Sequence, residues 1–213
     1  MMTTNQEFKN AALAALNGNW APAVLATLVI SVISCVVSGA TSLYELYNPD
    51  AFATLMGLNG GSMLLSVFVL IPLGVGATYA FNALYVYSNR EVLSNSFGYG
   101  FKIYWRAIGG TLLVALFTFL WALLLVIPGI IKAYSYSMTP YILIDNPELS
   151  VREALRKSQR MMTGQKFNLF YLQLSFIGWF ILACLTGGIG FLWLTPYYQT
   201  SQAVFYQNLR NNL

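Results

Sequence analysis

Six runs of apolar residues, each about as long as a membrane crossing, follow one another along this chain. A transmembrane helix needs about 20 predominantly apolar residues, and a helix pairs its backbone polar groups within a single segment. The pattern therefore predicts an all-α, polytopic membrane protein with six transmembrane helices in three hairpins. The predicted spans cover residues 20–40, 62–87, 107–127, 129–144, 167–186 and 190–208.

The composition favours the same class of protein. Apolar residues make up 57% of the 213 residues and charged residues 8%, against about 25% charged residues in an average soluble domain. We therefore expect a single membrane domain over residues 1–213. The formal net charge of +4 does not predict a nucleic-acid partner, because the basic residues lie in short segments beside apolar runs, where they set topology and contact anionic membrane lipids.

The basic residues also predict how the chain crosses the membrane. Ten of the eleven Lys and Arg residues lie on one side of the predicted spans, and the exception is Lys132. Residues 41–61 carry no basic residue, whereas residues 88–106 and 145–166 are rich in them. By the positive-inside rule, residues 41–61 are outside, and both termini are cytoplasmic.

The segments between the predicted spans are themselves patterned as amphipathic helices. Thr4 and Glu7 form one capping-box signature, and Ser150 and Glu153 form a second one. Such helices, with basic and apolar faces, lie in the membrane interface. The predicted cytoplasmic interface helices cover about residues 4–17, 94–106 and 150–163.

Small side chains recur every four residues on the first predicted span, at Ala23, Thr27, Ser31, Cys35 and Gly39. In a helix this spacing produces one narrow stripe, which lets two backbones approach closely in lipid. We interpret the stripe as a helix-packing surface. On that interpretation, the substitution Ser31→Leu disturbs folding.

Polar side chains form a stripe on each of the second, fourth and sixth predicted spans. Unpaired polar groups cost free energy in hydrocarbon, so these stripes face one another, a wet cavity or the interface. Ordinary hydrogen bonding between helices and a ligand-lined cavity are both compatible with them. The candidate binding residues are Thr78, Asn82 and Tyr85, then Lys132, Ser135, Tyr136 and Thr139, and finally Gln199, Gln202 and Tyr206.

Lys132 is the one charged residue inside a predicted span. A charge there costs at least about 2.5 to 3.5 kcal/mol on insertion scales, which makes it a candidate functional residue. Two placements are open. Lys132 lies three residues after Gly129, near a predicted outer turn, so its stem can reach the outer headgroups; alternatively it faces inward and contacts an anion, a phosphate or a substrate.

Signatures of catalysis and of metal binding are absent from the sequence. The chain has no histidine, which removes the commonest general base and metal ligand. Cys35 and Cys184 both lie in apolar runs, so we interpret them as packing residues without a disulfide. The glycines at positions 187, 188 and 190 predict a tight outer turn. We expect no enzymatic activity, no metal and no cofactor.

Several stretches of the chain resemble the bacterial membrane protein family called domain of unknown function 975. The stretches are residues 127–138, 140–143, 153–155, 174–179 and 188–190, with Ser158, Met162, Gly164, Lys166, Trp193, Pro196, Tyr197, Phe205 and Tyr206. Residues 16–20, 72–74 and 97–101 are similar more weakly. The resemblance implies an integral protein of the bacterial cytoplasmic membrane, and it supplies no catalytic or binding residues.

Together these features favour a non-enzymatic membrane protein that binds a lipid, an amphipathic peptide or a partner membrane protein. The polar stripes and Lys132 would line its site. The alternative is a small transporter or channel subunit, in which the stripes form a pathway between oligomerising chains. No acidic residue lies within a predicted span, which argues against a proton-coupled carrier.

Overall fold

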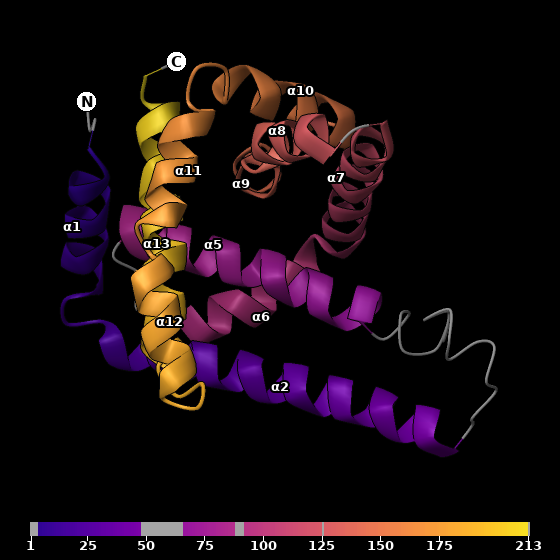
Figure 1. Cartoon of the computed structure of the whole chain (residues 1–213), viewed down its shortest axis with the longest axis vertical. Helices are drawn as coiled ribbons and strands as arrows, with labels where there is room; N and C mark the ends of the chain where they lie inside the picture. The colour runs from indigo at the N-terminus through magenta and orange to yellow at the C-terminus, as the bar shows by residue number, and fades with distance from the viewer. Residues whose placement is uncertain (1–3, 48–65, 88–91, 125, 213) are drawn as a thin grey trace.

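The computed structural model describes residues 4–47, 66–87, 92–124 and 126–212, and within these ranges every regular element is a helix (Figure 1). The all-α prediction is therefore confirmed for the described residues. In chain order the helices are α1 (Asn5–Leu16), α2 (Trp20–Tyr47), the π-helical turn Ser66–Leu70, α5 (Ile71–Tyr87), α6 (Val92–Lys102), α7 (Tyr104–Leu124), α8 (Val126–Tyr136), α9 (Thr139–Asp145), α10 (Val151–Met161), α11 (Lys166–Leu174), α12 (Ile177–Leu185) and α13 (Phe191–Arg210).

Both predicted capping boxes are confirmed. At the start of α1, the Thr4 hydroxyl accepts a hydrogen bond from the Glu7 backbone N–H, and the Glu7 carboxylate accepts one from the Thr4 N–H. Ser150 and Glu153 make the same reciprocal pair at the start of α10. Two of the predicted interface helices therefore begin at the predicted residues, because side chains satisfy their first backbone donors.

Within the described ranges, four helical segments are long and apolar enough to cross a membrane. They are Trp20–Val37, Val67–Tyr87, Tyr104–Leu123 and Lys166–Leu185, which correspond to the first, second, third and fifth predicted spans. Residues 62–65, the start of the second predicted span, lie outside the described residues. The predicted spans 129–144 and 190–208 are not among the four.

The fourth predicted span is divided between two short helices. α8 ends at Tyr136 and α9 begins at Thr139, where Pro140 lies in the first turn of the new helix and needs no intrahelical hydrogen bond. The start of this segment also differs from the prediction. α8 begins at Val126 rather than after Pro128, so Pro128 lies in the first turn of α8, where its missing N–H costs nothing.

Among the described residues, α8 folds back on α7, and α13 folds back on α12. α8 packs closely on α7, since a Cβ built on Gly129 would lie 2.7 Å from Ala122 Cα. α13 turns back along α12 after Gly187 and Gly188, whose φ angles of 66° and 92° favour glycine and form the predicted tight turn. The predicted hairpin between α2 and α5 is not confirmed: α2 packs mainly against α6 and α13.

α6 occupies most of the predicted interface segment 94–106, and it packs tightly against α5. A Cβ on Gly76 would collide with the Ser96 carbonyl oxygen, and a Cβ on Gly100 would collide with the Pro72 carbonyl oxygen. The two backbones are therefore in contact at both glycines. The predicted segment extends too far, because residues from Tyr104 onward already belong to α7.

α1 forms as predicted but does not stand apart from the helical core. It lies lengthwise against α13, and the Phe8 ring meets the Phe205 ring at a centroid distance of 5.3 Å (Figure 1). As a result Trp20, at the start of α2, lines the same cavity as Thr186 of the α12–α13 turn. The predicted topology had placed these two residues at opposite membrane surfaces. The apolar face of α1 accounts for the difference, because it is buried by protein rather than by lipid.

The two chain ends lie close together at one end of the molecule, and α10 lies at the same end (Figure 1). The α12–α13 turn lies at the other end. The largest buried cluster fills the space where α9, α10, α11 and α13 meet, and its members include Ile142, Met162, Leu169, Phe176 and Phe205. This core fixes the positions of α9 and α13, which carry the polar residues discussed next.

Candidate functional site

A cavity of about 400 Å³ lies where α12 and α13 meet α5 and α9. Three of its residues, Thr78, Gln199 and Gln202, belong to the polar stripes that the sequence singled out. The two stripes come from segments more than a hundred residues apart, and the fold brings them to one space. The lining is Thr78 of α5, Tyr141 of α9, Phe180 of α12, and Leu194, Thr195, Tyr198, Gln199 and Gln202 of α13.

α13 supplies the polar wall of this cavity because its lining residues recur at helical spacing. The Tyr198 ring packs edge-on against Phe176 and Phe180, at centroid distances of 5.4 and 5.8 Å. Gln202 follows Tyr198 by one helical turn, and both side chains line the cavity. Two aromatic rings therefore hold Tyr198 at the same wall that carries the Gln202 amide.

Thr78 and Tyr141 line the cavity from α5 and α9. The Thr78 hydroxyl donates to the Gly74 carbonyl oxygen at 3.0 Å. Its oxygen can still accept a hydrogen bond from a donor group of a ligand. Tyr141 stacks on Tyr206 at a centroid distance of 4.9 Å. The cavity thus combines amide and hydroxyl groups with aromatic and aliphatic walls, which suits a ligand with both polar and apolar parts.

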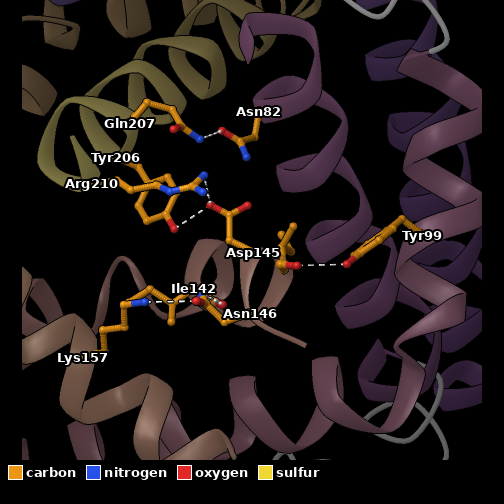
Figure 2. Close-up of polar contacts among 10 residues, drawn as sticks. Asn82, Tyr99, Ile142, Asp145, Asn146, Lys157, Tyr206, Gln207 and Arg210 are labelled. Atoms are coloured by element: carbon orange, nitrogen blue, oxygen red, sulfur yellow. Dashed lines mark hydrogen bonds and ion pairs between the residues drawn. The ribbon is translucent and has the colours of Figure 1, made fainter. Parts of the chain in front are cut away.

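Three further members of the α5 and α13 stripes are absent from the lining of the cavity. Asn82 is buried, and its side-chain oxygen accepts a 2.8 Å hydrogen bond from the Gln207 amide (Figure 2). Tyr206 is buried as well, and Tyr85 packs partly buried against the main core. The stripes of α5 and α13 therefore face each other, and part of their polarity is used in pairing the helices.

The structure does not bring the polar stripe of the fourth predicted span to this cavity. The Lys132 ammonium lies over the Trp121 ring of α7, 4.7 Å from its centroid, and Ser135 donates to the Ile131 carbonyl oxygen. Tyr136 and Thr139 line a separate cavity of about 140 Å³ between α7 and α9. Lys132 is therefore half-buried on the α7–α8 hairpin, away from Gln199 and Gln202.

The stripe of small residues on α2 is used only in part within the chain. Ala23 and Thr27 are buried, whereas Ser31, Cys35 and Gly39 are exposed. The second half of α2 extends beyond the rest of the protein (Figure 1), which is why the later members of the stripe have no helix against them among the described residues.

Cys35 and Cys184 are both free, as predicted, but both are exposed. They are thus not packing residues inside the protein, because each lies on the outward face of its helix. Among the residues that the structure describes, no group of three histidine, cysteine or acidic side chains is close enough to hold a metal ion.

A second polar cluster, which the sequence did not predict, surrounds the end of α9 (Figure 2). Asp145 accepts a hydrogen bond of 2.8 Å from the Tyr206 hydroxyl and forms a 2.9 Å ion pair with Arg210. On the other side, the Tyr99 hydroxyl donates to the Ile144 carbonyl oxygen at 3.0 Å. Three helices, α6, α9 and α13, are joined at this point.

The loop after Asp145 is held by Arg106 of α7. Its guanidinium donates to the carbonyl oxygens of Asn146, Pro147 and Leu149, while the Lys157 ammonium donates to the Asn146 side chain at 3.1 Å. These carbonyls follow the end of a helix and have no intrahelical donor. The one visible sequence signal was an acidic residue at the end of an apolar run, and nothing indicated its partners.

Residues 122–213 match the model of a family described as "Protein of unknown function (DUF975)". The match runs from the end of α7 to the chain end and includes Lys132 and the α13 wall of the cavity. Comparisons with curated proteins and with solved structures give no significant match. The resemblance found in the sequence is therefore confirmed as a match over residues 122–213.

Proposed function

We propose that this protein is a multi-pass protein of the bacterial cytoplasmic membrane that binds an amphipathic membrane molecule, a lipid in the first place. The observation that carries the proposal is the convergence of Thr78, Gln199 and Gln202 on one cavity whose other walls are aromatic or aliphatic. The volume of about 400 Å³ lies within the range of small-ligand sites. Amide groups would hold the polar part of the ligand, and the aromatic walls would contact its chain.

Four apolar helices of spanning length support the membrane location. The proposal includes several crossings of the membrane, with cytoplasmic termini. It is supported by the return of α8 along α7 and of α13 along α12, and by the position of both termini at the end of the molecule that carries α10 (Figure 1). α10 presents Arg152, Arg156 and Arg160 outward, as expected for a cytoplasmic surface.

The proposed role is binding without catalysis. The cavity offers amide, hydroxyl and aromatic groups, and these position a ligand by hydrogen bonds and packing. An amphipathic peptide or the helix of a partner membrane protein has the same combination of polar and apolar surface. The test below therefore identifies the class of ligand from its mass.

Native mass spectrometry of the protein extracted with its own lipids tests the proposal. We expect the wild-type chain to retain a lipid, and the double variant Gln199→Leu with Gln202→Leu to lose it, because the amides that hold the polar group are gone. Gln159→Leu is the matched control, since Gln159 lies on α10 outside the cavity. The proposal fails if wild type and the double variant retain the same ligands.

Transport is the competing outcome of the same test. A chain that retains no ligand but carries ions or solutes across liposome membranes, with flux abolished by Gln202→Leu and unaffected by Gln159→Leu, would replace binding by a transport function. In that case the facing stripes of α5 and α13 line a pathway.

A further inference from the structure

A second cavity of about 400 Å³ lies on the other side of the contact between α12 and α13. It is formed where the end of α1 and the start of α2 approach this hairpin. Three of the five tryptophans of the chain line it, Trp20, Trp179 and Trp193, and Leu194 borders both this cavity and the polar one.

The walls of this cavity are almost entirely apolar. Thr186 is its most polar neighbour near the turn, and the Thr186 hydroxyl is already engaged. It donates to the Ala183 carbonyl oxygen at 2.8 Å and accepts from the Gly190 N–H at 2.9 Å. Water needs two to four polar partners to occupy a cavity, and a polar ligand would lose hydrogen bonds here. The Tyr197 hydroxyl and the indole N–H groups add a few polar atoms to the lining, but apolar surface predominates, so the cavity favours an apolar occupant.

The mouth of the cavity opens on an exposed apolar surface. Trp179 is 54% exposed, Trp193 51% and Leu182 55%, whereas Ala183 and Leu194 are buried at its floor. Leu182 lies in the segment Lys166–Leu185 and Trp20 in the segment Trp20–Val37, both of which are apolar enough to cross a membrane. The apolar molecules at such a mouth are the hydrocarbon chains of the bilayer.

We propose that this tryptophan-lined cavity binds one hydrocarbon chain of a membrane phospholipid. The phospholipid belongs to the leaflet at the α12–α13 turn. Indole rings favour the level of the headgroups, so Trp179 and Trp193 flank the point of entry while the chain extends toward Leu194. The proposal does not depend on the polar cavity, because the two cavities share only Leu194 in their linings.

Tryptophan fluorescence provides the test. In a Trp105→Phe, Trp121→Phe background the three remaining tryptophans all line the cavity. The protein is placed in nanodiscs that contain increasing fractions of phosphatidylcholine with brominated acyl chains, which quench nearby indoles. If the cavity binds a lipid chain, quenching saturates at a lower brominated fraction than it would through simple contact with the surrounding bilayer.

Filling the cavity should abolish its preference for an acyl chain, which is measured as the early saturation of quenching. Leu13→Phe with Leu182→Phe places two rings in the space of the chain and displaces about two methylene groups, which lowers the relative affinity about tenfold. Leu25→Phe with Leu185→Phe is the matched control, since both residues are exposed and neither lines the cavity. Leu182→Phe alone, at an exposed position, serves as a second filled variant if the double variant does not fold.

Three results would overturn the proposal. The first is quenching in proportion to the bulk brominated fraction for the wild type. The second is an equal loss of preference in the filled variant and the control. The third is the retention, in native mass spectrometry, of a molecule from the expression host that is not a phospholipid and that is lost in Leu182→Phe. Retention of one phospholipid by wild type and control, with its loss in the filled variant, supports it.

Discussion

The ammonium group of Lys9 donates a 2.9 Å hydrogen bond to the carbonyl oxygen of Ser175. Ser175 lies at the interruption between α11 and α12, where backbone carbonyls lose their intrahelical donors. The same ammonium lies 4.4 Å from the centroid of the Phe176 ring. Lys9 therefore joins α1 to the middle of the segment Lys166–Leu185.

Replacing Lys9 by Met should loosen α1 from this segment. A hydrogen bond from a charged donor contributes about 1.5 to 3 kcal/mol, and partial exposure of Lys9 reduces this, so we expect a loss of about 1 kcal/mol. Thermal unfolding in detergent measures it. Lys9→Arg keeps a donor at this position and should lose less; an equal loss in both variants would contradict the role of the hydrogen bond.

Asp145 should contribute more to the stability of the fold than its partner Arg210. The Asp145 side chain is 14% exposed and that of Arg210 52%. Asp145→Ala leaves the buried Tyr206 hydroxyl without its acceptor, at a cost of about 1 to 3 kcal/mol. Arg210→Ala breaks a largely exposed ion pair and should cost less than about 1 kcal/mol. Chemical denaturation of the two variants compares them, and a larger loss for Arg210→Ala would reverse the assignment.

Gly76 and Gly98 offer a matched pair of glycine-to-alanine substitutions on the packed helices α5 and α6. A Cβ at Gly76 collides with the Ser96 carbonyl, whereas a Cβ at Gly98 has no atom within 4 Å. We expect Gly76→Ala to destabilise the protein by about 3 kcal/mol or more. Gly98→Ala should stabilise it by up to about 1 kcal/mol through helix propensity. Similar melting temperatures for both variants would exclude the close contact.

Thr27 and Ser31 separate the two halves of the stripe on α2. Thr27 is buried, and its hydroxyl donates to the Ala23 carbonyl oxygen at 3.0 Å, whereas Ser31 is exposed. Thr27→Leu should lower thermal stability in detergent through overpacking, by about 1 to 3 kcal/mol. Ser31→Leu should change it little, contrary to the sequence-based expectation. A large loss in Ser31→Leu would indicate that a partner covers this half of α2.

The capping box of α10 predicts a dependence of stability on pH. Hydrogen bonds from the Ser150 hydroxyl and from its backbone N–H lower the pKa of Glu153 below its ordinary value of 4.5. A lowered pKa in the folded state adds stability above about pH 4.5, and this contribution disappears as the pH falls through the folded pKa. Glu153→Gln should remove this part of the acid sensitivity in a pH series of unfolding curves. An unchanged pH profile would exclude the effect.

Features with a local cause could be predicted from the sequence. The capping boxes at Thr4 and Ser150 depend on residues three positions apart, and the turn at Gly187 depends on the glycines themselves. The polar face of α13 was visible because Gln199 and Gln202 recur at helical spacing. These signals do not depend on where the other helices lie.

Features that join distant segments could not be predicted in the same way. The Asp145–Arg210 pair links positions 65 residues apart, and the approach of Gly76 to Gly100 depends on how α6 folds back on α5. The position of Lys132 over Trp121 was not predicted, because neither open placement of this residue, at the outer headgroups or facing an inward ligand, included an aromatic partner. Hydropathy alone also could not show that α1 is covered by α13 instead of by lipid.

Leu194 is the one residue that borders both the polar cavity and the tryptophan-lined cavity. Its side chain is buried, so a displacement of this side chain changes the space in both cavities. A molecule in the polar cavity that shifts this side chain must therefore change the affinity of the tryptophan-lined cavity for its lipid chain. Thermodynamic reciprocity requires the lipid chain to change the affinity of the polar cavity by the same factor. A single leucine thus provides a physical basis for cooperativity between a polar ligand and a lipid chain.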